Sequence, residues 1–154
     1  MRQIKRNFFV DITSISFPEG SRKAKIEAVP LLRDYFETGL SEGRTFTREK
    51  GEKKQYFSSG QVSNLGWFRM YAEAYLKNHP VIDHNQTIVV RHRQSSEHGM
   101  PVQIYAFTNR TDFITYENVQ SEIFEHLIIM AGEFGLRIYQ QPSGYDVKPQ
   151  PQTN

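Results

Sequence analysis

The sequence contains no cysteine and no long apolar run. Without cysteine the chain can form neither disulfide bonds nor a zinc site built from thiolates, so a reducing, cytoplasmic setting suits it. The longest uninterrupted apolar segment covers residues 127–131, whereas a membrane-spanning helix needs about 20 apolar residues. We recognise no signal peptide at the start of the chain. We therefore expect the 154 residues to form one soluble domain with its own core.

Neither sign of charge dominates the chain, which has 19 Lys and Arg against 17 Asp and Glu. The distribution is uneven, because residues 1–54 hold 12 basic and 8 acidic side chains, whereas residues 55–154 hold 7 and 9. So mild a basic excess does not predict a surface that binds polyanions.

Residues 99–144 organise the rest of the chain, because their hydrophobic period changes twice. Apolar residues alternate along Val102–Thr108, which is the period of a strand. They then recur at three or four residues, which predicts the buried stripe of a six-turn helix, formed by Tyr116, Val119, Ile123, Leu127, Met130 and Phe134. Leu136–Gln141 follows as a short strand. A strand, a helix and a strand at this spacing predict two parallel strands in one sheet.

The ends and the outer side of this helix also have clear signals. Thr111 or Asp112 can cap its first turn, and Gly135 can end its last. The side opposite the apolar stripe is acidic, because the residues from Asp112 to Phe134 include no Lys or Arg. The acidic residues are Asp112, Glu117, Glu122, Glu125 and Glu133. We expect them on a solvated face.

The first part of the chain predicts a strand over Lys5–Phe17, with Phe8, Val10 and Ile12 on its buried face. Ser21 can cap a helix that Pro30 divides near Val29, with its second half over Leu31–Thr38. The basic, glycine-containing stretch 39–60 is then expected to be an exposed excursion.

The middle of the chain predicts a second helix and a hairpin. Ser63 or Asn64 caps a helix that ends before Pro80 and buries Leu65, Phe68, Ala72, Tyr75 and Leu76. Strand-like runs over Thr87–Gln94 and Met100–Thr108 are separated by a short polar segment that fits a hairpin.

This order of elements predicts an α+β fold, a ferredoxin-like β-α-β-β-α-β sandwich. A helical and loop insertion at about 39–80 separates its first helix from its second strand. We expect Lys5–Phe17, Thr87–Gln94, Val102–Thr108 and Leu136–Gln141 in one sheet, with the first and third adjacent and parallel. Residues 1–146 form the single domain, and 147–154 form a disordered tail.

Seven blocks of the sequence, taken in order, resemble one known family. They are KRNFFVDITSISF at 5–17, LLRDYF at 31–36, SNLGWFRMYAEAYLKNHP at 63–80, TIVVRHR at 87–93, YAFTN at 105–109, TYENVQSEIFEHL at 115–127 and EFGLRIYQQPSG at 133–144. Together they resemble the end of the cytoplasmic region of MscS-like mechanosensitive channels, specifically the miniconductance branch. The resemblance covers nearly the whole chain, from about Lys5 to Asp146.

The resemblance implies a function without enzymatic chemistry. The family's domain forms the wall of a cytoplasmic chamber below a heptameric pore, at the cytoplasmic face of the bacterial inner membrane. An upstream region, absent from this sequence, would supply the membrane helices. Tension would open the pore under hypo-osmotic stress. Neither a cofactor nor a nucleic-acid partner is implied.

The residues that could act in catalysis or bind a metal ion do not form a known catalytic or metal-binding motif. His79, His84, His92 and His98 fall within twenty residues of one another, but no HExxH motif accompanies them, so we interpret them as surface histidines. His126 lies beside the apolar stripe of the acidic helix, without a nucleophile paired to it. We therefore expect neither an enzyme nor a metal site.

Nucleic-acid binding is the alternative function, because ferredoxin-like sheets can stack RNA bases on exposed aromatic residues. Tyr105 and Phe107 lie on one face of the predicted central strand. The basic-glycine-aromatic signature of such sheets is missing, and the basic residues concentrate in the excursion. We favour instead a subunit interface, formed by this face and by an aromatic cluster on the second helix. The interface candidates are Trp67, Phe68, Tyr71, Tyr75, Tyr105 and Phe107.

Overall fold

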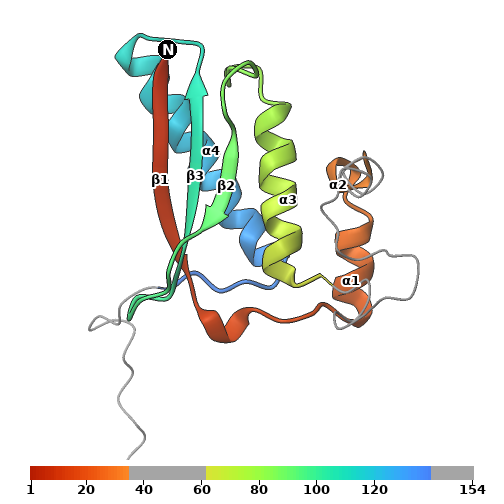
Figure 1. Cartoon of the computed structure of the whole chain (residues 1–154). Helices are drawn as coiled ribbons and strands as arrows, with labels where there is room; N and C mark the ends of the chain where they lie inside the picture. The colour runs from red at the N-terminus through yellow and green to blue at the C-terminus, as the bar shows by residue number, and fades with distance from the viewer. Residues whose placement is uncertain (35–61, 140–154) are drawn as a thin grey trace, which may run out of the picture.

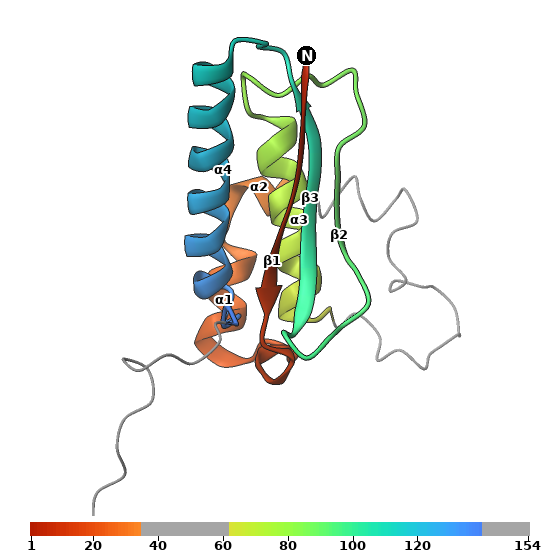
Figure 2. The same ribbon diagram turned by 90° about the vertical axis from the view of Figure 1, so that its left-hand side faces the viewer.

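The computed structural model describes residues 1–34 and 62–139, which form a mixed α+β fold. Three antiparallel strands make one sheet, and α4 crosses one of its faces (Figures 1 and 2). The elements in chain order are β1 (Arg2–Val10), the 3-10 turn η1 (Ile12–Ser14), α1 (Gly20–Glu27), α2 (Pro30–Asp34), α3 (Asn64–Lys77), β2 (Val89–His92), β3 (Met100–Thr108) and α4 (Phe113–Glu133).

The central strand β3 pairs antiparallel with both neighbours, in the order β1-β3-β2. The predicted adjacency of the first and third strands is confirmed, whereas the predicted parallel orientation is wrong. The connections explain the difference. The helical segment between β1 and β2 returns the chain to the end where β1 began, so β2 runs in the direction of β1. The hairpin then reverses β3 against both.

The alternation predicted for β3 is confirmed. Val102, Ile104 and Ala106 are fully buried on the face that the helices cover, whereas Tyr105 and Phe107 lie on the opposite face and are half-buried. The side-chain period of two along a strand therefore separates a core face from an outer face.

Strand β1 is shifted from the predicted Lys5–Phe17, because it begins at Arg2 and ends at Val10. The strand ends where the Asp11 carboxylate accepts the Thr13 backbone N–H at 2.9 Å, which caps η1. Ile12, predicted on the buried face, is consequently 45 % exposed.

As far as Tyr139, where the described range ends, the chain after α4 joins the sheet through one bridge pair. Ile138 forms an isolated antiparallel bridge with Val10, and the Tyr139 N–H donates to the Phe9 carbonyl at 2.7 Å. The predicted strand Leu136–Gln141 is therefore a bridge as far as the structure describes it, since its last two residues lie outside the described range.

The first helical region is divided at Pro30, as predicted. Helix α1 ends at Glu27, and α2 begins at Pro30 because proline is tolerated in the first turn of a helix but not in its interior. The predicted cap at Ser21 is wrong, since Ser21 lies inside α1, whose N-cap Glu19 makes no side-chain hydrogen bond. Residues 35–38 of the predicted second half lie outside the described range.

Helices α3 and α4 are capped as predicted. The Ser63 hydroxyl accepts the Gly66 N–H at 3.0 Å, and the Asp112 carboxylate accepts the Thr115 N–H at 3.0 Å. Gly135, just after α4, has a φ of +86°, a left-handed conformation that glycine adopts without a steric cost.

One hydrophobic core joins the sheet to the helices. Its largest fully buried side chains include Phe68, Phe134, Ile4, Ile26, Leu32 and Leu76. Of the predicted insertion, 39–61 lies outside the described residues, as does the predicted tail 147–154. Within the described ranges, no helix has both the length and the apolar character needed to cross a membrane.

Candidate functional site

The face of the sheet opposite α4 is the first candidate surface. On β1 the side chains of Gln3, Lys5 and Asn7 are exposed on this face, and the register sets Lys5 opposite Tyr105. None of the described helices lies over it in Figure 2. We call this surface, formed by Gln3, Lys5, Asn7, Val89, Arg91, Tyr105 and Phe107, the outer sheet face.

The two predicted interface aromatics are brought together on the outer sheet face. The rings of Tyr105 and Phe107 meet edge to face, with centroids 5.5 Å apart. Gln3 Nε2 donates to the Tyr105 hydroxyl at 3.3 Å, so the tyrosine is also held by the neighbouring strand. This face therefore presents aromatic area in a fixed geometry.

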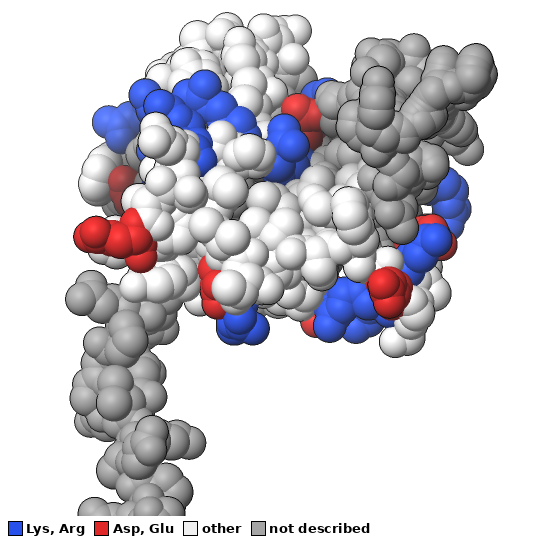
Figure 3. All heavy atoms as spheres, turned by 60° about the horizontal axis from the view of Figure 1, so that its bottom comes forward, with Lys and Arg blue, Asp and Glu red and all other residues white. Residues whose placement is uncertain are grey.

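The strands of the sheet carry basic residues and no acidic ones. Their sequences contain Arg2, Lys5, Arg6 and Arg91. Lys5 and Arg91 lie on the outer sheet face, where Arg91 Nε donates to Gln103 Oε1 at 3.0 Å. In Figure 3 several Lys and Arg side chains gather at the upper left, above a lower edge where both signs mix. Sequence reasoning missed this basic face, because only the register unites residues 86 positions apart.

Arg2 and Arg6 serve a different purpose, since their guanidinium groups lie over aromatic rings of α4. The Arg6 guanidinium carbon is 4.4 Å from the centroid of Phe124, and that of Arg2 is 5.0 Å from the centroid of Tyr116. Such cation–π contacts join the edge of the sheet to the helix. The Tyr116 hydroxyl also donates to the Gln3 carbonyl at 2.6 Å.

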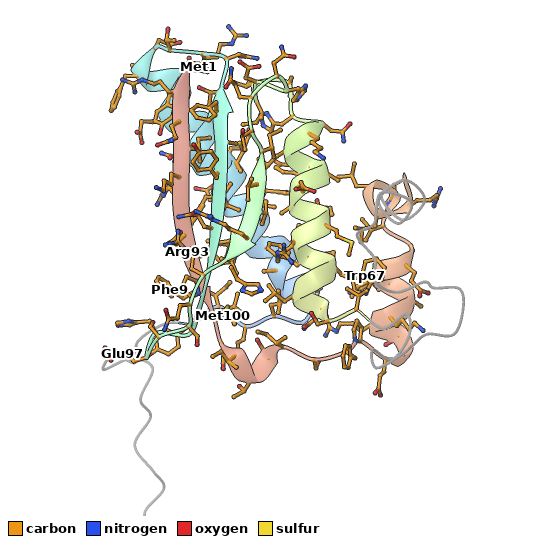
Figure 4. All side chains as sticks on the ribbon, in the orientation of Figure 1. Met1, Phe9, Trp67, Arg93, Glu97 and Met100 are labelled. Atoms are coloured by element: carbon orange, nitrogen blue, oxygen red, sulfur yellow. The ribbon has the colours of Figure 1, made fainter. Side chains whose placement is uncertain are left out.

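Three of the four aromatic residues predicted at an interface on α3 lie in the core of the chain itself. Trp67, Phe68 and Tyr71 are 8 %, 0 % and 6 % exposed, so they cannot form the surface patch that we expected. Helix α3 contacts α2, β2 and α4, and therefore buries more than one of its sides. Figure 4 shows Trp67 on the side of α3 that faces α1 and α2, whereas Phe9, Arg93 and Met100 lie near the lower end of the sheet.

A second candidate site joins α3 to α4 through a histidine between two tyrosines. The Tyr71 hydroxyl lies 2.7 Å from His126 Nε2. The Tyr75 ring stacks on the His126 ring, with centroids 4.3 Å apart and planes 17° apart. His126 is therefore held by one hydrogen bond and one stacking contact, both from α3.

Burial perturbs the titration of all three groups. Burial lowers the pKa of His126, although the charge of Glu122 opposes this effect. Burial is also the main cause that raises the pKa of Tyr75 to about 12, with the charges of Glu122 and Tyr71 adding to it, and burial raises the pKa of Tyr71. The uncharged forms of all three are thus favoured, which suits a packed polar cluster.

His79 extends this cluster toward the surface. Its Nδ1 accepts the Val81 N–H at 3.1 Å, and its Nε2 lies 3.5 Å from Glu122 Oε1. Because Nδ1 accepts a hydrogen bond, the ring N–H is on Nε2 and is directed at the carboxylate. We predicted His79 to be a surface residue, but only 10 % of its side chain is exposed.

The remaining predicted surface histidines, His84, His92 and His98, are exposed, and Nε2 of His84 lies 3.0 Å from the His79 carbonyl oxygen. In the part of the chain that the structure describes, no three His, Asp or Glu side chains are grouped as a metal ion would require. The contacts of His126 are with Tyr71 and Tyr75, so the chemistry of the cluster is hydrogen bonding and stacking.

The side of α4 turned away from the core is the third candidate surface. It carries Glu122 and Glu125 together with Ile114 and Ile129, which are 71 % and 67 % exposed. We call this surface the outer α4 face. Sequence reasoning identified its charges but missed its exposed isoleucines, although helical spacing places them on the same stripe as Glu125.

A comparison with the sequence models of known protein families finds none that matches this chain. The outer sheet face and the outer α4 face are turned away from the core, whereas the histidine cluster lies between two helices of one chain.

Proposed function

We propose that this chain is the cytoplasmic vestibule domain of an MscS-like mechanosensitive channel and has no enzymatic activity. In this proposal a membrane region upstream of the domain opens under tension and releases ions or small osmolytes in hypo-osmotic stress. The domain lies at the cytoplasmic face of a bacterial inner membrane, where copies of it form the wall of a chamber.

The observation that carries this proposal is that the family-like blocks coincide with structural elements. The block at 63–80 contains α3 with its cap Ser63, and the block at 115–127 contains most of α4. The block at 87–93 contains β2. A resemblance whose blocks follow the structural elements in order supports similarity over the whole fold. A single short motif would support similarity only at that motif.

We also propose that the domain is ferredoxin-like, with Leu136–Gln141 as its fourth strand. The order β1-β3-β2 and the bridge from Ile138 to Val10 support this assignment, because a split β-α-β topology pairs the fourth strand with the first.

The proposed assembly is a closed ring, as the family resemblance implies, with seven copies. The outer sheet face supports it, since half-buried aromatic rings on an open face are typical of protein interfaces. A ring needs two different complementary surfaces on each copy, because only head-to-tail contacts close into a cycle of this kind.

Binding of single-stranded RNA is the second candidate function, and the basic character of the outer sheet face favours it. Lys5 lies opposite Tyr105, and Arg91 lies opposite Gln103 on the same face, so phosphate and base contacts could both form there. The central strand reads MPVQIYAFT, however, and lacks the signature of RNA-recognition sheets. We therefore place RNA binding below the channel proposal.

The reading frame upstream of Met1 distinguishes these two candidates. Several apolar segments of about 20 residues in that frame would support the channel. An upstream frame that encodes a soluble enzyme or an RNA-binding protein would refute it.

A further inference from the structure

The sheet and α4 have opposite charges and lie on opposite sides of the molecule. The three strands contain basic residues without acidic ones, whereas α4 contains four glutamates and no Lys or Arg, namely Glu117, Glu122, Glu125 and Glu133. Figure 2 shows α4 on one side of the sheet, with the outer sheet face on the other. Asp83, whose N–H donates to the Phe107 carbonyl, lies at one end of the sheet and leaves its centre basic.

The two faces also match in apolar character. On α4, Ile114 and Ile129 are exposed and so take no part in the hydrophobic core. Helical spacing places them on one stripe, on either side of Glu125. Tyr105, opposite Lys5, and Phe107 beside it supply aromatic area on the outer sheet face. Each face therefore combines an apolar strip with charges, of opposite sign on the two faces.

The lengths of the two faces agree as well. The stripe from Ile114 to Ile129 covers about 22 Å of helix at the usual rise per residue. The exposed side of β1 from Gln3 to Phe9 covers about 20 Å of strand. One face can therefore lie along the other over its whole length.

We propose that the outer sheet face of one copy of this chain binds the outer α4 face of the next copy. This inference rests on the ring of the proposed function and names the contact that builds it. Lys5 and Arg91 lie against the carboxylates of Glu122 and Glu125, while Tyr105 and Phe107 pack against the exposed isoleucines. The contact is heterologous, so each copy uses both faces and a chain of copies can close.

Charge complementarity favours a second copy of this chain as the binding partner of the outer sheet face. An acidic helix with exposed isoleucines is the complement of a basic, aromatic sheet face, and the chain itself presents such a helix. Three of the four α3 aromatics that we first expected at the interface, Trp67, Phe68 and Tyr71, are buried, so α4 takes their place as the second surface.

Cysteine cross-linking tests this contact directly, because the chain has no cysteine of its own. Asn7→Cys marks the outer sheet face, and Ser121→Cys marks the outer α4 face; both positions are exposed. The two positions lie on opposite sides of the molecule, so they cannot form a disulfide within one chain, which requires Cα atoms within about 7 Å. Oxidation is carried out at about 1 mM protein, the order of effective concentration that a short flexible linker provides.

We expect a mixture of the two single variants to form the mixed disulfide in excess over both symmetric dimers. A chain with both substitutions should form a ladder of products larger than dimers. Lys23→Cys, exposed on α1, is the matched control and should not link to Ser121→Cys above the background. Symmetric Asn7→Cys dimers as the main product, or linkage to the control at the same rate, would overturn the proposal.

Charge reversal gives a second, independent readout. Lys5→Glu or Glu125→Lys alone should slow formation of the mixed disulfide by about 2- to 5-fold, the effect of one exposed ion pair, and the two together should restore it. Glu97→Lys in the exposed hairpin is the matched control and should change little. Equal slowing by all three variants, or loss of cross-linking only when single-stranded RNA is added, would contradict the contact between copies.

The outcome is separable from that of the proposed function. If the variants form the cross-linked ladder but membranes that contain the protein show no tension-activated current, the contact between copies stands and the channel proposal is rejected. If the current is present but the ladder does not form, the channel proposal stands and this contact is rejected.

Discussion

The Tyr71 hydroxyl lies 2.7 Å from Nε2 of His126, and this contact joins α3 to α4 across 55 positions of sequence. Tyr71 is buried and His126 is partly buried, so the hydrogen bond is made where water is partly excluded. If one of the two groups is removed, the other is left partly buried without a hydrogen bond, which lowers the stability of the folded chain.

Tyr71→Phe should therefore lower the free energy of unfolding by about 1 kcal/mol, measured by urea denaturation. Tyr75→Phe is the matched control, since Tyr75 contacts His126 through its ring rather than its hydroxyl. It should change stability by less than about 0.5 kcal/mol. Equal losses in the two variants would show that the hydroxyl contact contributes nothing specific.

The lowered pKa of His126 predicts a loss of stability in acid. Burial holds this pKa below its usual value of 6.5, so the unfolded chain binds the proton more readily than the folded chain does. Stability is then fully present above pH 6.5 and is lost as the pH falls through the lowered pKa. His92, whose pKa is lowered by burial and then by the charge of Arg69, acts in the same direction.

The measurement is urea denaturation at pH 7.5 and at pH 5. His126→Gln should lose less stability between the two than the natural chain, and His126→Gln with His92→Gln should lose least. An acid loss in His126→Gln as large as that of the natural chain would contradict the assignment.

The core face of α4 can be tested by truncation. Leu127 is fully buried, so Leu127→Ala should lower the free energy of unfolding by about 2–5 kcal/mol. Glu125→Ala, on the exposed side of the same helix, should change it by less than about 0.5 kcal/mol. Equal shifts of the melting temperature would mean that the helix faces are assigned wrongly.

Asp11 fixes the chain after α4 to the end of β1. The Thr13 hydroxyl donates to its carboxylate at 2.7 Å, and Arg137 donates from Nε at 3.1 Å and from Nη2 at 2.8 Å. The hydrogen bonds from Thr13 and then from Arg137 lower the pKa of Asp11 from 3.8 to about 2. This contribution to stability is present above pH 3.8 and is lost as the pH falls through about 2.

Carboxyl chemical shifts followed by NMR between pH 1.5 and pH 5 give this pKa directly. Thr13→Val and Arg137→Gln should each raise it toward 3.8. A midpoint near 3.8 in the natural chain would mean that these contacts do not form in solution.

RNA binding distinguishes the two functional candidates on the outer sheet face. We expect no salt-sensitive binding of single-stranded RNA, measured by fluorescence anisotropy at 50 and 200 mM salt. Should micromolar binding occur and weaken by about 1–3 kcal/mol in both Tyr105→Ala and Phe107→Ala, RNA stacking would replace subunit contact as the function of this face.

Local signals in the sequence were enough to predict α3 and α4 with their caps, and the division of the first helical region, but not the cap of α1. Ser63 and Asp112 each precede an apolar period of 3.6, and Pro30 divides the first helical region. The end of β1 was also encoded locally, because Asp11 two residues before Thr13 is typical of a side-chain turn. The apolar alternation through Phe8, Val10 and Ile12, however, predicted a longer strand and outweighed this turn signal.

The arrangement of elements depends on information that no local pattern holds. The direction of β3 against β1 follows from how the connection returns the chain, and the burial of Trp67 and Phe68 follows from how many neighbours α3 has. The contact between Tyr71 and His126 likewise exists only after α3 and α4 pack. A sequence pattern predicts which face of a single helix or strand is buried. It does not predict which other element packs against that face, because this depends on the tertiary structure.

The central claim is most directly tested by electrical recording from membranes that contain the complete protein to which this chain belongs. Excised patches from cells that express it, in a host without channels of its own, should show currents that appear with suction and vanish when it is released. Their absence, with the protein present in the membrane and suction applied up to rupture of the patch, would contradict the account.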